Sequence, residues 1–202
     1  MIPSIFAFII AYLLGSINTS IIVSKLFKAS DIRTQGSGNA GATNTLRVLG
    51  KKAAILVVVG DALKGVLAVL IAKYIVHITS VSEAQYLAAL GVVVGHIFPL
   101  YFGFRGGKGI MTSIAVVFCL NPLMALILFV IFVGLVFIFN YISLASVVCS
   151  VCFPVLVLIF ESGNTAFLIS AILMALLAVL KHSSNIKRLI NGTESKFIKK
   201  HK

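Results

Sequence analysis

Long apolar runs dominate the chain, and short polar segments separate them. Residues 1–24 contain no Asp, Glu, Lys or Arg, and neither does the run of 52 residues from Gly109 to Phe160. An α-helix rises about 1.5 Å per residue, so about 20 apolar residues cross the hydrocarbon core of a bilayer. The pattern predicts an all-α polytopic membrane protein. Its first run lacks the basic leading segment of a secretory signal, so we interpret that run as a retained helix.

The 52-residue run is too long for two spans and somewhat short for three. Asn121-Pro122 and Asn140-Tyr141 are the expected breaks, because proline cannot continue a helix without losing a backbone hydrogen bond. The sequence therefore predicts a bundle of about seven transmembrane helices in a single domain, residues 1–202, with the segment Gly109–Leu120 short for a full crossing. The spans expected outside the long run are Met1–Ser24, Ala53–Ala72, Ala84–Phe104 and Thr165–Leu180.

The basic residues indicate the direction of these spans. With seven helices, fifteen of the seventeen Lys and Arg residues fall on one side, and the opposite loops hold Glu83 and Glu161 but no Lys or Arg. The positive-inside rule places the fifteen cations in the cytoplasm. The sequence thus predicts an N-terminus outside and a cytoplasmic C-terminus with a basic tail at residues 181–202. A model with five transmembrane helices would also place the two termini on opposite sides of the membrane.

Composition removes several classes of protein. Hydrophobic residues make up 60% of the 202 residues and charged residues only 11%, against about 25% charged in soluble domains. That is too little polar surface for a soluble or disordered chain. We interpret the net charge of +12 mainly as a topological signal and expect no nucleic-acid partner. Cys149-x-x-Cys152 has metal-site spacing, but no His or acid lies near it in sequence, so we interpret these cysteines as small apolar residues.

Polar residues gather in four segments on the predicted cytoplasmic side. The first, Gly36–Asn44, has glycines that let backbone N–H groups turn toward an anion, together with neutral donors at Ser37 and Thr43. Arg47 follows and can bind phosphate through two hydrogen bonds. We predict an anion-binding loop. The alternative is a solvated loop whose basic flank faces anionic lipid heads.

The second segment runs from Gly95-His96-Ile97-Phe98-Pro99 to Gly106-Gly107-Lys108-Gly109. Three glycines around one lysine let its ammonium group and the neighbouring amides converge on a phosphate at a helix N-terminus. We interpret His96 as a satisfied buried histidine. Two nucleotide motifs fail here: no strand precedes Gly36-x-Gly38-x-x-Gly41, and Gly109 stands where a Walker loop needs Ser or Thr.

The third and fourth segments are Asn140–Ser146 and the tail from Lys181. The third offers hydroxyl groups at the ends of two apolar helices, which is weak evidence alone. In the fourth, His182 and Asn185 share one face if the segment is helical. Asp61 and Lys64 lie three residues apart inside a span, where a functional pair and a structural pin between helices fit equally well.

Conventional catalytic signatures are missing from the chain. It has no His-x4-Asp acyltransferase base, no Gly-x-Ser-x-Gly elbow and no His-Glu-x-x-His. Asp31 and Glu194 are the acids on the predicted cytoplasmic side, too few for a two-metal phosphoryl-transfer site. The residues alone therefore indicate a membrane protein whose cytoplasmic face carries phosphate-binding groups.

Taken together, these motifs resemble the signature of one bacterial family, the PlsY acyl-phosphate:glycerol-3-phosphate acyltransferases. The resemblance covers nearly the whole chain in order and length, and its first two motifs are long enough to be specific. It rests on Gly36–Arg47, on Gly95–Pro99 with Gly106–Gly109, on Ser143-Leu-Ala-Ser146 and on His182-x-x-Asn185.

The resemblance implies an enzyme that transfers a fatty acyl group from acyl phosphate to the sn-1 hydroxyl of glycerol 3-phosphate, giving lysophosphatidic acid and phosphate. This is the first step of bacterial phospholipid biosynthesis. It implies a seven-helix bundle in the bacterial inner membrane, surrounded by membrane lipids, with the active site facing the cytoplasm and without cofactor or metal. The expected phosphate-binding residues are Ser37, Gly38, Asn39, Thr43, Asn44, Arg47, Gly106, Gly107 and Lys108. The expected catalytic residues are Ser146, His182, Asn185 and Lys108.

Three other functions stay open on the sequence alone. A phosphate-ester transporter would use the same glycines and cations, but transporters bind near the midplane of the membrane. A CDP-alcohol phosphotransferase would need several Asp residues around a metal. A lipid-binding assembly factor would hold lipid without turnover.

Overall fold

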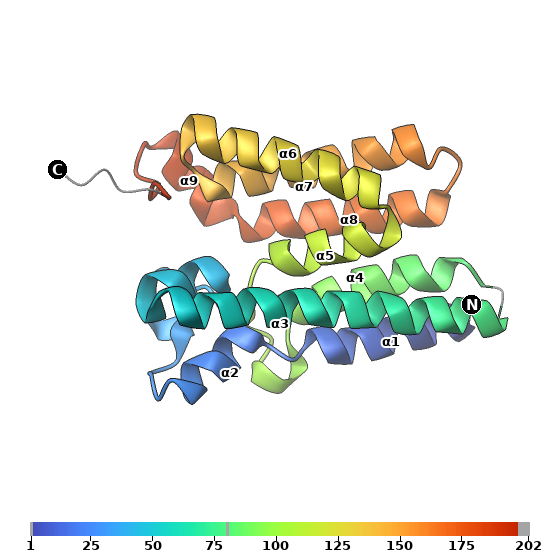
Figure 1. Cartoon of the computed structure of the whole chain (residues 1–202), viewed down its shortest axis with the longest axis horizontal. Coiled ribbons are helices and arrows are strands. Elements are labelled where there is room, and N and C mark those ends of the chain that lie inside the picture. Colours follow the sequence, from blue (N-terminus) through green and yellow to red (C-terminus); the bar gives the residue numbers. More distant parts are fainter. Residues whose placement is uncertain (1, 80, 198–202) are drawn as a thin grey trace. The chain divides into compact units, whose positions relative to one another are not determined.

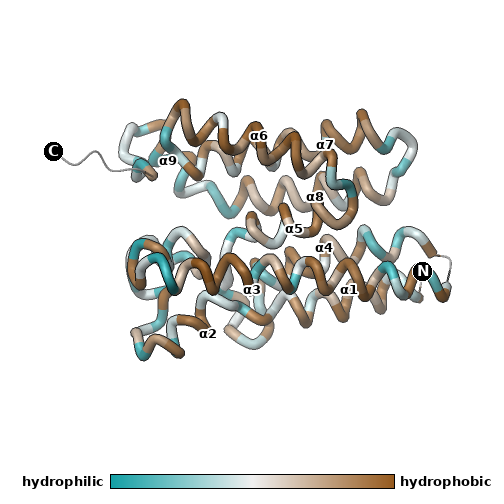
Figure 2. Tube along the Cα trace, in the orientation of Figure 1, coloured by the Kyte–Doolittle hydropathy of each residue, from teal (hydrophilic) through white to brown (hydrophobic). Residues whose placement is uncertain are grey.

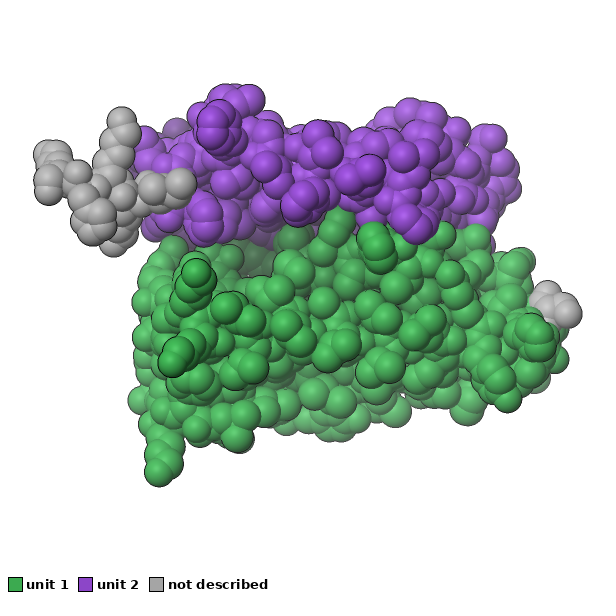
Figure 3. Space-filling view, in the orientation of Figure 1, with its two compact units in different colours: residues 1–120 green, residues 121–202 purple. Residues whose placement is uncertain are grey.

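A computed structural model describes residues 2–79 and 81–197 of the chain. The described residues are all-helical, with 79% of them in helices and none in a strand (Figure 1). The chain divides into two compact units, Met1–Leu120 and Asn121–Lys202 (Figure 3), and each is described by itself. The prediction of a single domain stays a prediction. Residues 198–202 of the predicted basic tail lie outside the described residues.

Five segments are long and apolar enough to cross a membrane within the described ranges, and a bent pair of helices raises the number to six. The segment Ile110–Leu120 has 11 residues and extends only about 16 Å, half of the hydrocarbon core. It is short, as predicted. The total of seven transmembrane helices and the side of the membrane on which each terminus lies stay predictions. The five segments are Ile2–Leu26, Ala42–Thr79, Glu83–Phe102, Pro122–Phe139 and Ile142–Phe160.

Small residues allow close packing in the first unit, where α1 (Ile2–Gly15) lies against α4 (Glu83–Ile97). Gly91 and Gly95 are spaced by one helical turn on α4. A Cβ atom at Gly95 would overlap the carbonyl oxygen of Tyr12, and one at Gly91 would lie 2.6 Å from that of Phe8. Lipid tails are as apolar as the side chains, so helices in a membrane gain from close van der Waals contact of this kind.

The first predicted span is one candidate crossing, but it is broken in two. The helix α1 ends at Gly15, and α2 (Thr19–Leu26) begins after Asn18, whose side-chain Oδ1 accepts a hydrogen bond from the backbone N–H of Ile21 at 3.1 Å. This is the usual N-cap bond that satisfies a free amide at a helix start. Sequence reasoning expected one uninterrupted helix here.

The second predicted span, Ala53–Ala72, is part of a much longer helix, α3 (Ala42–Thr79). Gly50 interrupts it with φ +83° and ψ −176°, a backbone conformation that favours glycine. The residues from Ala42 to Leu49, before this kink, are helical, whereas the sequence pattern placed them in the loop. The remaining helix of this unit is α5 (Ile110–Leu120), and two short 3₁₀ turns lie at Ile32–Thr34 and Leu100–Phe102.

The second unit contains α6 (Pro122–Phe139), α7 (Ile142–Phe160), α8 (Thr165–Lys181) and α9 (Ser183–Ile190). Both predicted breaks in the 52-residue run are confirmed, since α6 begins at Pro122 and ends just before Asn140. Hydrophobic residues follow α6 and α7 along most of their length, and polar residues gather at the turns (Figure 2). At one end, the Asn121 Nδ2 donates to Glu161 Oε1 at 3.0 Å and joins two turns.

Candidate active site

The first glycine segment forms a loop between α2 and α3. Gly36 and Gly38 have φ +57° and +71°, so these glycines supply the left-handed backbone that the sequence argument required of them. The loop leads directly into the start of α3, and a helix N-terminus favours an anion. The N–H groups of Asn44 and Thr45 already donate to the Gly41 carbonyl at 3.1 and 3.0 Å, so any anion would bind before them in the loop and first helical residues. Ser37, Gly38 and Thr43 are exposed, and Asn39 is half-buried.

Asn44 holds this loop in shape. Its Nδ2 donates to the carbonyl oxygens of Ile32 at 3.1 Å and Gln35 at 3.0 Å, and its Oδ1 accepts from the backbone N–H of Ser37 at 2.8 Å. The side chain is only 1% exposed. These contacts give Asn44 a structural role, and its predicted contact with phosphate stays a prediction.

The second glycine segment is a turn between α4 and α5. The N–H of Gly106 donates to the Ile97 carbonyl and that of Gly107 to the His96 carbonyl, both at 3.2 Å. Gly109 has φ +82°, and α5 begins at the next residue. Lys108 is half-buried and lies two residues before a helix N-terminus. This is the position that the sequence predicted for it.

The two glycine segments lie side by side. A Cβ atom at Gly107 would come within 2.5 Å of the carbonyl oxygen of Ala40, so only glycine allows the two backbones to approach this closely. The Nη1 of Arg33 donates to the carbonyl oxygens of Phe102 at 2.7 Å and Arg105 at 3.3 Å and joins the same two segments. The structure therefore brings together the first two predicted motifs, 60 to 70 residues apart in the chain.

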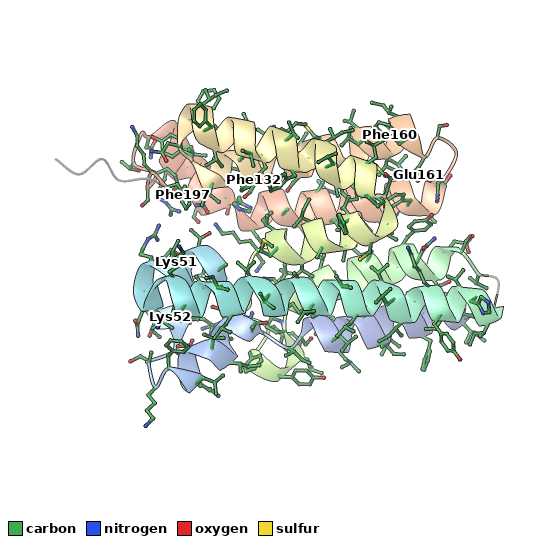
Figure 4. The ribbon with its side chains drawn as sticks, in the orientation of Figure 1. Lys51, Lys52, Phe132, Phe160, Glu161 and Phe197 are labelled. Atoms are coloured by element: carbon green, nitrogen blue, oxygen red, sulfur yellow. The ribbon has the colours of Figure 1, made fainter. Side chains whose placement is uncertain are left out.

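Positive charge dominates this end of the first unit. Asp31 is paired with Arg33 at 2.7 Å, and the hydrogen bonds from Arg33 hold the pKa of the Asp31 carboxyl below its ordinary value. Arg47 is exposed, and within the described parts of the chain it forms no hydrogen bond or ion pair. Lys51 and Lys52 are exposed near the start of α3 (Figure 4). Exposed cations are therefore concentrated at this end of the unit, and Arg47 is the one among them that the sequence predicted as a phosphate ligand.

In the second unit, Glu194 brings together the third and fourth polar segments. Its Oε1 accepts from Ser143 Oγ at 2.7 Å and from Asn185 Nδ2 at 2.6 Å, and its Oε2 accepts from Arg188 Nε at 2.6 Å. Burial alone would raise the pKa of Glu194, but the hydrogen bonds from Asn185, Ser143 and Arg188 outweigh it and lower the pKa. The sequence analysis counted Glu194 as one of two acids on the predicted cytoplasmic side and assigned it no partner.

The other predicted catalytic side chains of the second unit are buried. Ser146 is 2%, His182 3% and Asn185 8% exposed. The Nδ1 of His182 lies 2.7 Å from the carbonyl oxygen of Ala178. Because a carbonyl can only accept, we assign the imidazole proton to Nδ1 and leave Nε2 as an acceptor. Ser146 Oγ donates to the Ile142 carbonyl at 2.9 Å.

The predicted site residues thus form two groups, one in each unit. The phosphate-binding candidates and Lys108 belong to the first unit, and Ser146, His182 and Asn185 belong to the second. Across the described residues, no group of three or more His, Cys, Asp or Glu side chains lies close enough to hold a metal ion.

Asp61 and Lys64 belong to a buried polar cluster inside the first unit. The Lys64 ammonium lies 3.0 Å from Asp61 Oδ1 and donates to the carbonyl oxygens of Gly15 at 3.2 Å and Ile17 at 3.0 Å. These carbonyls belong to the break between α1 and α2. The pair therefore joins α3 to this break, a contact that agrees with the structural alternative and leaves the functional one a prediction. His96 is 3% exposed and contacts both charged groups, so its interpretation as a satisfied buried histidine is confirmed.

Known proteins are similar to this chain in sequence. The family model described as Glycerol-3-phosphate acyltransferase matches residues 5–192. The Glycerol-3-phosphate acyltransferase of Clostridioides difficile (strain 630) is 49% identical over 140 residues, 68% of this chain and 69% of the relative. That of Thermoanaerobacter pseudethanolicus is 51% identical over 138 residues, 68% of each chain.

Two solved structures of PlsY, an integral membrane glycerol 3-phosphate acyltransferase, share the fold. The glycerol 3-phosphate form has a TM-score of 0.88 and 39% identity, covering 96% of both chains. The lysophosphatidic acid form has a TM-score of 0.84 and 38% identity, covering 96% of this chain and 94% of the other. With the family match over both units, these likenesses show that the chain belongs to the glycerol-3-phosphate acyltransferase (PlsY) family of integral membrane enzymes of phospholipid synthesis.

Proposed function

We propose that this enzyme transfers a fatty acyl group from acyl phosphate to the sn-1 hydroxyl of glycerol 3-phosphate. The products are lysophosphatidic acid and inorganic phosphate, and the reaction opens bacterial phospholipid synthesis. The observation that carries the proposal is the contact between the two glycine segments, where Gly107 lies against the Ala40 carbonyl beside Lys108. Two phosphate-bearing substrates need two sets of donors close together.

The chemistry suits this set of residues. Acyl phosphate is a mixed anhydride and is already activated, with phosphate as its leaving group. The enzyme mainly has to hold two phosphates and one acyl carbonyl in place, which is catalysis by proximity and electrostatic stabilisation. It needs neither a covalent nucleophile nor a metal. The proposed phosphate-binding residues are Ser37, Gly38, Asn39, Thr43, Asn44, Arg47, Gly106, Gly107 and Lys108. Asn44, Gly106 and Gly107 donate within the loops, so their part in this proposal is to hold the loops in shape around the phosphates.

Ser146, His182 and Asn185 position the glycerol hydroxyl and the acyl carbonyl in this proposal. The Nδ1 of His182 donates to the Ala178 carbonyl, which fixes the orientation of the ring. Asn185 donates through Nδ2 to Glu194, which sets the orientation of its amide. Both side chains are therefore held in defined orientations, as groups that position a substrate must be.

The proposed location is the bacterial inner membrane, with the site open to the cytoplasm, the N-terminus outside and lipids as the surroundings. The support is the distribution of charge, since fifteen of the seventeen Lys and Arg residues belong to segments on one predicted side. Glycerol 3-phosphate is a charged metabolite that reaches the enzyme from that side.

The direct test incubates purified protein with palmitoyl phosphate and glycerol 3-phosphate and follows lysophosphatidic acid, with palmitoyl-CoA as the comparison donor. We expect product from palmitoyl phosphate alone. Product from palmitoyl-CoA at an equal rate would refute the proposed donor. In proteoliposomes, passage of labelled glycerol 3-phosphate across the bilayer without acylation would support a transporter instead.

Lys108→Ala tests the site itself. Loss of one preorganised donor costs about 3 kcal/mol of transition-state stabilisation, roughly a 150-fold loss of kcat/KM. Lys52→Ala is the matched control, because Lys52 is an exposed lysine beyond the kink of α3, and it should keep normal turnover. Near-normal activity of correctly inserted Lys108→Ala would show that the site assignment is wrong.

A further inference from the structure

A buried polar cluster lies inside the first unit, next to the second glycine turn. It joins three helices, with Asp61 and Lys64 from α3, His96 from α4 and Thr112 from α5. The His96 Nδ1 lies 2.9 Å from Lys64 Nζ and 3.4 Å from Asp61 Oδ1. Thr112 Oγ1 donates to the Asp61 carbonyl at 3.2 Å. All four residues are at most 5% exposed.

The cluster fixes the state of the His96 ring. Lys64 is an ammonium group paired with the Asp61 carboxylate. Its three hydrogens are used by the carbonyl oxygens of Gly15 and Ile17 and by His96 Nδ1, because an ammonium group can only donate. His96 Nδ1 must therefore accept, and the ring proton belongs on Nε2. The carboxylate and the ammonium balance each other, and the ring stays neutral, which is the least costly arrangement of these groups inside a membrane.

The Nε2 edge of the same ring supports the glycine turn. A Cβ atom at Gly107 would overlap His96 Nε2, so the backbone of Gly107 rests directly on the ring edge. The backbone of His96 adds a hydrogen bond, since its carbonyl oxygen accepts the N–H of Gly107 at 3.2 Å. Gly107 is thus held between the His96 ring on one side and the Ala40 carbonyl on the other.

From these contacts we propose that His96, locked by Lys64 and Asp61, is a positioning residue that sets the place of Lys108. The inference rests on the proposed role of Lys108 as a phosphate ligand. The Nε2 edge of the ring packs against Gly107, one residue before Lys108. Removal of this edge would let the glycine turn shift, and the Lys108 ammonium group would move away from its phosphate. Misplacement of a binding group by about 1 Å can cost a hundredfold in rate.

Two substitutions distinguish the role of the Nδ1 edge, which contacts Lys64, from that of the Nε2 edge, which contacts Gly107. His96→Asn keeps an acceptor near the position of Nδ1 but removes the edge that supports Gly107. His96→Gln reaches that edge with its amide and is the conservative rescue. His77→Gln is the matched control, because His77 is an exposed histidine in the last turn of α3.

The first measurement is hydrogen exchange of the peptide 103–110 in the full-length protein in detergent, which needs no catalytic activity. The N–H groups of Gly106 and Gly107 donate to backbone carbonyls, so they report whether the turn is held. We expect His96→Asn to exchange about tenfold faster here, and His96→Gln and His77→Gln to stay within about threefold of the wild type.

The second measurement is steady-state kinetics with palmitoyl phosphate and glycerol 3-phosphate. His96→Asn should lose tenfold to about a hundredfold in kcat/KM, with a melting temperature close to that of the wild type, and His96→Gln should recover most of the loss. A lower melting temperature with unchanged exchange and unchanged kinetics would reduce His96 to a structural residue and overturn the proposal. Unchanged exchange in His96→Asn overturns it whatever the kinetics.

Lys64→Gln keeps the test decisive if His96→Asn does not fold. Its amide has two hydrogens, enough for the carbonyl oxygens of Gly15 and Ile17, and none remains for His96 Nδ1. The ring is released while the helix break keeps its partners, so the same peptide should again exchange faster. If the wild type failed to use palmitoyl phosphate, the proposed donor would fail, but the exchange result would still decide the role of His96.

Discussion

Replacement of Glu194 by glutamine tests the polar cluster of the second unit most directly. The carboxylate accepts three hydrogen bonds, from Ser143 at 2.7 Å, Asn185 at 2.6 Å and Arg188 at 2.6 Å. Glutamine has the same shape, but only one of its two terminal atoms can accept. At least one of the three donors loses its partner, and the remaining bonds lose the help of a full negative charge.

The magnitude follows from burial. A hydrogen bond to a charged group contributes about 1.5–3 kcal/mol. The Glu194 side chain is 8% exposed, whereas that of Arg188 is 41% exposed and can turn to water, so the arginine adds little. We expect a loss of about 2 kcal/mol, mostly from Ser143 and Asn185. For a chain of this size that lowers the melting temperature by about 4–8 °C.

The pH dependence has a definite sign. The folded-state pKa of Glu194 lies below its ordinary value of 4.5. Its contribution to stability is therefore fully present above pH 4.5 and is lost as the pH falls through the folded-state pKa. The melting temperatures of the wild type and Glu194→Gln should differ at pH 7 and converge in acid. Asp31 also has a lowered pKa, but both proteins contain it, so it cancels in the comparison.

Thermal unfolding in detergent, followed by circular dichroism at several pH values, measures this difference. Glu161→Gln is the control, because Glu161 accepts one hydrogen bond, from Asn121, and glutamine can still accept it. The reasoning fails if Glu194→Gln melts with the wild type at pH 7, or if the gap is as wide in acid as at neutral pH.

Two further changes test the first unit. Gly95→Leu should lower the melting temperature of the protein by several degrees, because the side chain enters the space of the Tyr12 carbonyl and such overpacking costs about 1–3 kcal/mol; Gly134→Leu, at a glycine with nothing within 4 Å, should have no such effect. Arg33→Met should raise the KM for glycerol 3-phosphate about tenfold with a smaller change in kcat, because the loops lose the hydrogen bonds to Phe102 and Arg105. An unchanged KM would mean that the loops hold each other without Arg33.

Much of the helical layout could be predicted because its signals are local. Helix α6 begins at Pro122 and ends just before Asn140, and both residue types mark helix boundaries through their own backbone chemistry. Both breaks were therefore visible in the sequence. The break between α1 and α2 was missed because residues 1–24 carry no charge, although the largely polar run from Gly15 to Ser20 contains a local signal in Asn18, the N-cap of α2. Its unpaired carbonyls are satisfied by Lys64, more than forty residues later in the chain. A stabilising partner at that distance leaves no trace in the local pattern.

In the candidate site, too, local features could be predicted from the sequence and long-range contacts could not. Residue types around Gly36, Gly38 and Lys108 indicated phosphate binding, and the left-handed glycines agree with that argument. Which side chains hold the loop and which are left for substrate depends on pairing in three dimensions. Asn44 has the chemistry of a phosphate ligand in sequence, yet in the structure its amide is used within the loop. Glu194 was counted only as one of two acids on the predicted cytoplasmic side, and it is the centre of a cluster.

The lysine at the broken helix also has a consequence for biosynthesis. Chains are made from the N-terminus, and early segments fold first. We therefore expect the Gly15 and Ile17 carbonyls to be in the bilayer before α3 is inserted. Lys64 can then donate to these two carbonyls as soon as it enters the hydrocarbon. A circular permutant that places α1 last would reverse this order. Its α3 would carry a cation with only Asp61 to balance it, and insertion of that helix should fail more often although every final contact is the same.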